Sequence, residues 1–262
     1  MEFVGYVASI FIGLILGMLG GGGSILSIPI LVYLFHIEPV MASAYSLFIV
    51  GITSLAGAIP KYREHLVNLR TGILFGIPSI LSIFCTRKWI VPAIPQVLFT
   101  HGEFVFTRRL LLLGLFALLM ILAAIPMVRG RKNFTSNNQR FRTFLVIVEG
   151  SLIGFLTGLV GAGGGFLIIP ALVFLTGLPF KTAVGTSLFI ISINSLFGFA
   201  GDLLNYVMDW PFLISISLLA IVGILLGNRL SRKIPADNLK IIFGWVTLSM
   251  GVYILFRELP LN

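Results

Sequence analysis

Long apolar stretches run from one end of the chain to the other, separated by short polar or charged segments. A helix needs about 20 apolar residues to cross a bilayer, and most of these stretches approach that length. The pattern therefore predicts an all-α, polytopic membrane protein whose side chains mostly face lipid or one another. The longest stretches are Phe3–Leu19, Ala42–Ile59, Leu110–Val128, Thr182–Ala200, Pro211–Gly227 and Leu239–Phe256.

The chain also repeats itself at a shift of 141 residues. This shift aligns Gly13–Gly57 with Gly154–Gly198 without a gap, and roughly 20 of about 45 positions are identical, more than shared hydrophobicity gives. The string Ser46–Ile49 falls on Ser187–Ile190. The sequence therefore predicts a first transmembrane repeat over 1–128, a basic link over 129–142 and a second repeat over 143–262.

Each repeat contains five apolar segments. They cover 3–19, 24–35, 42–59, 71–86 and 110–128 in the first half, and 143–160, 166–176, 182–200, 211–227 and 239–256 in the second. The second segment, about 18 Å long as a helix, is too short to cross the membrane core. It either crosses next to the first segment or folds back on it as one broken hairpin. Both alternatives give an odd number of crossings, so the halves are predicted to be inverted copies, the plan of many secondary transporters.

Composition and charge agree with a membrane protein. The chain is 58% hydrophobic and 10% charged, with a mean hydropathy of +1.08, which excludes an ordinary soluble domain. The net charge is +9, and the basic residues that produce it stand between the apolar segments. This placement indicates that they orient the protein in the membrane and do not bind nucleic acid. We expect a cytoplasmic link, with both termini outside; against this, Arg87, Lys88, Arg108, Arg109 and Arg257 then also fall outside.

The first four of those basic residues flank 89–99, an insertion that the second half lacks. Its two prolines, Pro92 and Pro95, make a regular spanning helix unfavourable, so we expect a short interfacial segment.

Two glycine clusters are the sharpest local feature, Gly20–Gly23 and Gly161–Gly165, each followed by a proline. Each glycine costs a helix about 1 kcal/mol relative to alanine, so the helix should break there. In a bilayer, freed backbone amides are tolerated only against protein or a hydrated cavity. These amides also lie at the start of the next helix, where the helix dipole favours an anion. In inverted copies both helix starts can converge near the centre, which predicts a site for a small anion.

Polar side chains in the third segment of each half form a second candidate group, which includes Ser43, Tyr45, Ser54 and Ser195. Ser46 and Thr53, and likewise Ser187 and Asn194, are two helical turns apart and share a face. Their hydroxyl and amide groups can donate to an oxyanion. The candidate substrate-binding residues are therefore Gly20, Gly21, Gly22, Gly23, Ser24, Ser46, Thr53, Gly161, Ala162, Gly163, Gly164, Gly165, Thr186, Ser187 and Asn194.

Each of these features also has a purely structural interpretation. Glycines let membrane helices pack closely, and hydroxyls bond between helices for about 1 kcal/mol or less. Two matched clusters with matched prolines favour a site, whereas a single Ser or Thr is more simply explained by packing.

Ionisable residues are rare inside the expected spans. Only Glu149 lies several residues into a helix, where it could carry a coupled proton or sit hydrated near the interface. Arginine and lysine are absent from the expected spans, so we expect amides, helix dipoles and hydroxyls to hold the anion without a side-chain cation. No grouping of cysteine or histidine suggests a metal or another cofactor.

These residues together resemble a known family. The two glycine clusters followed by proline, the repeated Ser-Leu-Phe strings and the basic link are similar to those of the TauE/SafE transporters, over nearly the whole chain. The resemblance implies a multi-pass inner-membrane protein that exports a small sulfur-containing anion such as sulfite, thiosulfate or a sulfonate. The first cluster departs from the usual form, because Gly21 and Ser24 stand in a Gly-Gly-Gly-Gly-Ser string.

Two other functions remain open from the residues. An anion channel could use the same helix starts. A membrane-embedded enzyme has less support, because no catalytic triad or paired buried carboxylates are predicted. The sequence leaves open the anion, the direction of transport, the oligomeric state and the coupling ion, for which a proton is one candidate.

Overall fold

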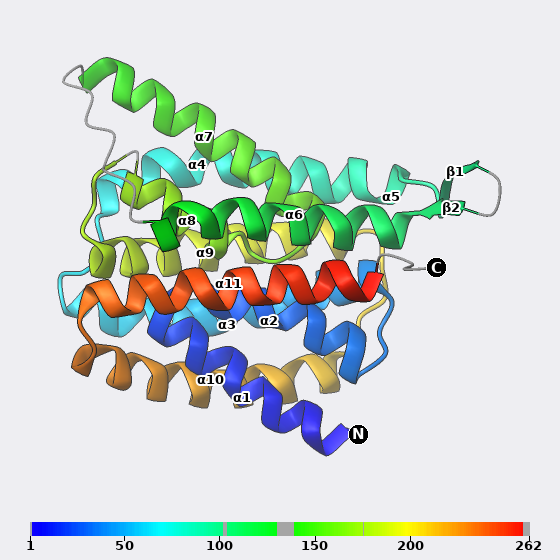
Figure 1. Ribbon diagram of the computed structural model, residues 1–262, viewed down its shortest axis with the longest axis horizontal. Helices are drawn as coiled ribbons and strands as arrows, with labels where there is room; N and C mark the ends of the chain where they lie inside the picture. The colour runs from blue at the N-terminus through cyan, green and yellow to red at the C-terminus, as the bar shows by residue number, and fades with distance from the viewer. Residues whose placement is uncertain (1, 102–103, 130–138, 175, 259–262) are drawn as a thin grey trace.

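Long helices lying side by side form the body of the molecule. The computed structural model describes residues 2–101, 104–129, 139–174 and 176–258. Within these residues, six helical segments are long and apolar enough to cross a membrane, which confirms the all-α membrane fold. They run along the long axis in Figure 1. Their helices are α3 Pro39–Arg63, α4 Leu69–Cys85, α6 Arg108–Arg129, α9 Phe180–Asp202, α10 Trp210–Lys233 and α11 Ala236–Glu258.

The first two apolar segments fold back on each other as one hairpin. Helix α1 (Glu2–Leu19) is followed by α2 (Gly22–Pro29) and the short π-helix η1 (Ile30–Leu34). A methyl group at Gly23 would overlap the backbone of Ile12, so α2 packs against α1. The rings of Tyr6 and Phe35 lie 5.7 Å apart, which brings the end of η1 back to the start of α1. The two segments therefore lie side by side in opposite directions, and the choice between two crossings and one broken hairpin stays a prediction.

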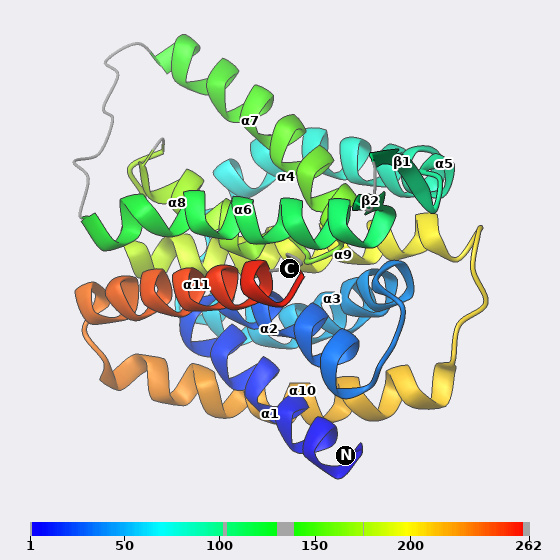
Figure 2. The same cartoon turned by 45° about the vertical axis from the view of Figure 1, so that its right-hand side comes forward.

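The second half builds a matching hairpin from α7 (Gln139–Val160) and α8 (Gly165–Phe174). Figures 1 and 2 show the two hairpins entering the bundle from opposite ends of its long axis. Inverted halves would have this arrangement, although the inverted relation itself stays a prediction.

Packing is reciprocal between the two halves. Helix α1 packs on α10, and its counterpart α7 packs on α4; α2 contacts α11, and α8 contacts α6. The helices α3 and α9, which correspond to each other, cross at the centre. The hairpin of each half therefore packs against long helices of the other half.

Individual hydrogen bonds repeat at the same shift of 141 residues. Asn68 and Asp209 each cap the following helix by accepting from an amide three residues on, Thr71 in one case and Phe212 in the other. The amide of Asn68 donates to Thr186, and the amide of Asp209 donates to the corresponding Tyr45. The duplication in the sequence is thus also present in the local structure.

The insertion differs from the expected interfacial segment. Helix α4 continues through a π-helical turn, η2 (Thr86–Ile90), into α5 (Val91–Ala93), and a hairpin of β1 (Val97–His101) and β2 (Phe104–Thr107) follows. Pro92 is the second residue of α5 and directly follows the π-helical turn. As a result Arg87 and Lys88, expected in an outer flank, lie within the spanning segment Leu69–Ala93.

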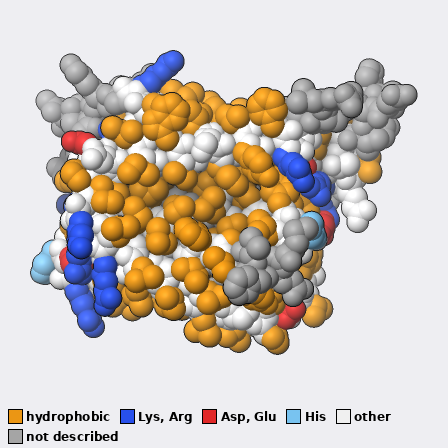
Figure 3. All heavy atoms as spheres, turned by 60° about the horizontal axis from the view of Figure 1, so that its bottom comes forward, with side chains coloured by type: hydrophobic (Ala, Val, Ile, Leu, Met, Phe, Trp, Pro, Cys, Tyr) orange, Lys and Arg blue, Asp and Glu red, His pale blue; other side chains and the backbone are white. Residues whose placement is uncertain are grey.

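The surface is consistent with a lipid environment. Figure 3 shows apolar side chains over the visible face, with basic side chains gathered towards its two edges. Three basic residues that the expected orientation places outside have acidic partners, in the pairs Arg87–Asp202, Arg108–Glu38 and Arg109–Glu258. The orientation itself stays a prediction, and residues 130–138 of the link lie outside the described residues.

Candidate functional site

The tips of the two hairpins meet at the centre of the bundle. Both helices break at the glycine clusters, as predicted: α1 ends at Leu19 and α7 ends at Val160. A methyl group at Gly21 would overlap the carbonyl group of Gly165, and one at Gly165 would lie 2.5 Å from the Cα of Gly21. The two clusters are therefore in direct backbone contact, which only glycine permits on both sides.

Positive φ angles produce the breaks. Gly20 has φ 70° and its counterpart Gly161 has φ 80°, a left-handed conformation in which other residues are strained. The amides of these two glycines close the preceding helices by donating to carbonyls four residues earlier, each at 2.7 Å. Gly163 and Gly164 also have positive φ, at 66° and 74°. The chain can reverse direction here only with glycine.

Two helix N-termini consequently face the same central region. The first amides of α2 and of α8 have no acceptor within their own helix, and the helix dipole makes both ends positive. The N-cap of α2 is Gly21, which offers no side-chain acceptor. Oriented backbone amides of this kind form an anion-binding environment without any charged side chain.

Two hydroxyl groups beside the second break are available to a ligand. A Cβ at Gly163 would lie 2.7 Å from Ser195 Oγ, and one at Gly164 would overlap Thr157 Oγ1. Both hydroxyls are buried, and neither has a hydrogen-bond partner among the described residues. Buried polar groups are normally paired, so these two mark a place where a polar ligand would be stabilised. Ser195 belongs to the polar group noted in the sequence, whereas Thr157 was missed because its repeat counterpart is Leu16.

The predicted polar residues near the first break bond to the protein itself. Ser24 donates to the carbonyl of Gly21 at 2.7 Å. Ser46 and Ser27 hydroxyls are 2.6 Å apart, and Ser187 donates to the carbonyls of Gly20 and Val184. These residues are placed beside the break, and they hold its shape.

Three further predicted residues lie on the crossing helices α3 and α9. Thr186 accepts from the amide of Asn68, and Asn194 donates to Ser79 Oγ on α4 at 2.6 Å. Thr53 Oγ1 and Asn194 Oδ1 are buried and have no partner in the part of the chain that the structure describes. Thr186 and Asn194 thus connect α9 to the region of α4. The predicted residue Ala162 is fully buried in the second break.

One expectation is wrong: arginine and lysine are not absent from the spans, and a buried arginine lies at the second break. Arg87 is fully buried, and a methyl group at Gly161 would overlap its Nη2 atom. Its Nη1 donates to Ser43 Oγ at 2.9 Å and lies 3.2 Å from Asp202 Oδ2. The sequence analysis placed Arg87 in a flank outside the membrane, because the fourth apolar segment was expected to end at residue 86. The continuation of α4 through η2 instead keeps Arg87 within the span.

A second buried cation, Lys61, lies near the opposite end of the bundle, where α3 ends. Its Nζ donates to Ser231 Oγ at 2.9 Å, and the residue is 4% exposed. Glu149 on α7 is half-buried, and its Oε2 atom has no hydrogen-bond partner within the described ranges. Glu149 is therefore not the only ionisable residue inside a span.

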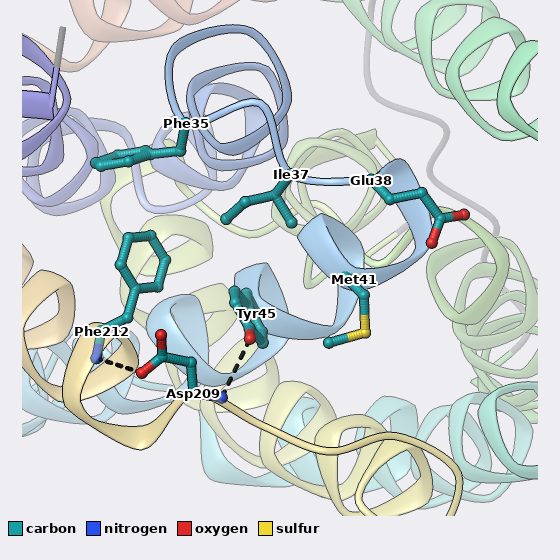
Figure 4. Close-up of a pocket in the computed structure, with 7 residues that line it drawn as sticks. All are labelled: Phe35, Ile37, Glu38, Met41, Tyr45, Asp209 and Phe212. Carbon is teal, nitrogen blue, oxygen red and sulfur yellow. Dashed lines mark hydrogen bonds between the residues drawn. The ribbon is translucent and has the colours of Figure 1, made fainter.

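An open pocket leads towards the start of α3, as Figure 4 shows. Its volume is about 350 Å³, and Tyr45, next to Ser46, is part of its wall. The Tyr45 hydroxyl accepts from the Asp209 amide at 3.1 Å and joins α3 to the loop before α10. The other lining residues are Phe35, Ile37, Glu38, Met41, Asp209 and Phe212.

Comparisons with known proteins point to one family. A family model described as "Sulfite exporter TauE/SafE" matches residues 6–254. A probable membrane transporter protein of Xylella fastidiosa strain 9a5c is 30% identical over 254 residues, covering 94% of this chain and 92% of the relative. The probable membrane transporter protein YunE of Bacillus subtilis is 25% identical, covering 96% and 98%, and MJ0441 of Methanocaldococcus jannaschii is 27% identical, covering 94% of each. No solved structure matches the chain.

Proposed function

Because the chain belongs to the TauE/SafE family of membrane transporters, we propose that it exports a small sulfur-containing anion across the inner membrane. Sulfite, thiosulfate and sulfonates are the candidate substrates. The proposal assigns the anion to the place where the tips of the two hairpins meet.

One observation carries the proposal: two unpartnered hydroxyls lie beside the helix start at the second break. The amides at the start of α8, the hydroxyl of Thr157 and the hydroxyl of Ser195 lie around the same run of glycines. Amides and hydroxyls suit the several acceptor oxygens of a sulfur oxyanion. The facing N-terminus of α2 adds a second positive helix end.

Burial of this region favours a transporter over an anion channel. Gly20, Gly21 and the segment 161–165 are all buried. A ligand held there must be released by a change of conformation, which is alternating access, whereas a channel needs an open path. Flux in proteoliposomes that saturates with substrate concentration supports the transporter, and flux that rises linearly supports the channel.

Removal of the two free hydroxyls tests the site. Ser195→Ala and Thr157→Val should each weaken binding of sulfite, thiosulfate or methanesulfonate by about 10- to 100-fold, the value of one hydrogen bond to a charged group. Neither change breaks a hydrogen bond within the described part of the protein, so the melting temperature should stay the same. Titration of purified protein measures the affinity, and thermal unfolding in detergent measures stability.

Ser217→Ala is the matched control. Ser217 on α10 is also buried, and its hydroxyl likewise has no partner among the described residues. Ser217 is close in sequence to Ala220, whose backbone packs against Gly13 of α1. Gly13 precedes the glycine cluster of α1, so Ser217 is remote from the second break. Binding that is unchanged in the Ser195 and Thr157 variants, or reduced equally in the Ser217 variant, argues against an anion site at the second break.

A further inference from the structure

The buried ion pair between Arg87 and Asp202 has a function that the fold alone does not explain. Both side chains are 0% exposed, and Arg87 Nη1 lies 3.2 Å from Asp202 Oδ2. Burial of two charges costs several kcal/mol per ion, and the cost is offset only when the geometry is good and the remaining donors and acceptors are satisfied.

The pair does not meet that condition. Arg87 Nε and Nη2, and both carboxylate oxygens of Asp202, have no hydrogen-bond partner among the described residues. On the same protein, Arg109 and Glu258 show the usual bidentate arrangement, with Nε and Nη2 donating at 2.9 and 2.8 Å. Arg87 thus keeps the same two donor atoms free that Arg109 uses to hold a carboxylate.

The free donors of Arg87 lie at the second break. Its Nη2 occupies the space where a side chain at Gly161 would otherwise be. Ser43 accepts from Nη1 and donates to the carbonyl of Val40 at 2.7 Å, which fixes the guanidinium on the α3 side. The guanidinium therefore lies beside the glycines of the second break.

The other half of the molecule shows that the architecture does not need this pair. At a shift of 141 residues, Arg87 corresponds to Asn228 and Asp202 corresponds to Lys61. Asn228 donates to the carbonyl of Gly57 at 3.1 Å, so the equivalent position is held by a neutral amide. The second break therefore has a buried ion pair, whereas the corresponding positions of the other half hold the neutral amide of Asn228 and the single cation of Lys61.

We propose that Arg87 is the side-chain cation of the anion site and that Asp202 is the counter-ion that the anion displaces. The inference rests on the proposed function and adds to it the group that recognises negative charge. The ligand is an oxyanion with at least two oxygens on one centre, such as sulfite or a sulfonate, because these oxygens match the planar guanidinium. When no anion is bound, Asp202 neutralises Arg87; when an anion binds, Asp202 competes with it and favours its release.

The surroundings of Asp202 fit the role of counter-ion. The amide of Tyr206 donates to the main-chain carbonyl of Asp202 at 3.0 Å, which places this tyrosine next to the aspartate. Burial raises the pKa of the Tyr206 hydroxyl, and the Asp202 carboxylate raises it further, so this neighbour stays neutral. Arg87 is the side chain that forms an ion pair with Asp202 among the described residues.

The test compares three variants of the full-length protein. Asp202→Asn should bind sulfite and methanesulfonate about tenfold or more tightly than wild type, because the competing carboxylate is gone. Arg87→Gln/Asp202→Asn, which leaves no unpaired buried charge, should retain the fold and bind about 100-fold or more weakly than Asp202→Asn. Arg87→Lys/Asp202→Asn should bind with intermediate affinity, because lysine keeps the charge and loses the planar fork. Isothermal titration gives the affinities, and melting temperatures verify folding.

The control neutralises a second ion pair with Arg109→Gln/Glu258→Gln, in which the arginine is half exposed and the glutamate is buried, and it should leave anion affinity unchanged. A folded Asp202→Asn protein that binds no more tightly than wild type, or a double variant that binds as well as Asp202→Asn, overturns the inference. Either result leaves the proposed function standing if wild type binds a sulfur oxyanion and Ser195→Ala weakens that binding. If wild type and Asp202→Asn both bind none of the anions, the proposed function and this inference fail together.

Discussion

Gly165→Val should lower the melting temperature by about 6–12 °C or prevent folding, because the two hairpin tips touch at this residue. The first atom of the new side chain would lie 2.5 Å from the Cα of Gly21 and 2.6 Å from Ile191 Cδ1. Backbone atoms cannot yield as a flexible side chain does, so overpacking should cost about 3 kcal/mol or more. For a chain of this size, each kcal/mol corresponds to about 2–4 °C. Thermal unfolding of purified protein in detergent measures the shift.

Gly114→Val supplies the control for this change. Gly114 lies in α6, and a Cβ there would have no neighbouring atom within 4 Å, so valine meets open space. Equal melting temperatures for the Gly165 and Gly114 variants would mean that the hairpin tips are separate in solution. The smaller substitution Gly165→Ala should fall between wild type and valine.

Gly163→Leu should abolish anion binding, since the side chain would fill the space next to the free donors. Gly163 has φ 66°, and its new Cβ would lie 2.7 Å from Ser195 Oγ and 2.9 Å from Val50 Cγ1. The side chain both covers the Ser195 hydroxyl and blocks the approach of an anion to the backbone. Equilibrium binding of sulfite, thiosulfate and methanesulfonate should fall below detection.

Gly163→Ala keeps this prediction testable if the leucine variant does not fold. Alanine adds one carbon beside Ser195, and we expect about tenfold weaker binding by a protein that still unfolds cooperatively. Gly114→Leu is the control for the added side chain and should bind as wild type does. Normal binding by a folded Gly163→Ala protein would place the anion elsewhere and return the glycine to a packing role.

The glycines divide into two physical classes. Gly13 and Gly17 of α1, with Gly223 and Gly227 of α10, bring two helices into backbone contact, which is the packing role that small residues often have in membranes. Gly161, Gly163 and Gly164 instead have positive φ and form the turn between α7 and α8. Gly21 and Gly165 belong to the clusters and yet also make a close backbone contact, so packing explains part of each cluster.

Some features of the fold could be predicted because they depend on local composition. Apolar length predicts a spanning helix, and four neighbouring glycines break one in any surrounding. Segment length alone did not decide whether α1 and α2 cross separately or fold back, because both arrangements satisfy it. The contact of Tyr6 with Phe35 shows that the two segments lie side by side in opposite directions.

The sequence by itself determined the membrane environment, the duplication, the two breaks and the glycines that produce them. These follow from hydrophobic length, internal identity and the conformational freedom of glycine, all of which are properties of residues close together in the chain. Only the tertiary structure decided which polar groups remain free. Ser46 has a partner in Ser27, Ser195 has none among the described residues, and Arg87 enters the core and lies at Gly161. Whether a hydroxyl or a guanidinium is satisfied depends on neighbours that are distant in sequence, and packing alone brings those neighbours together.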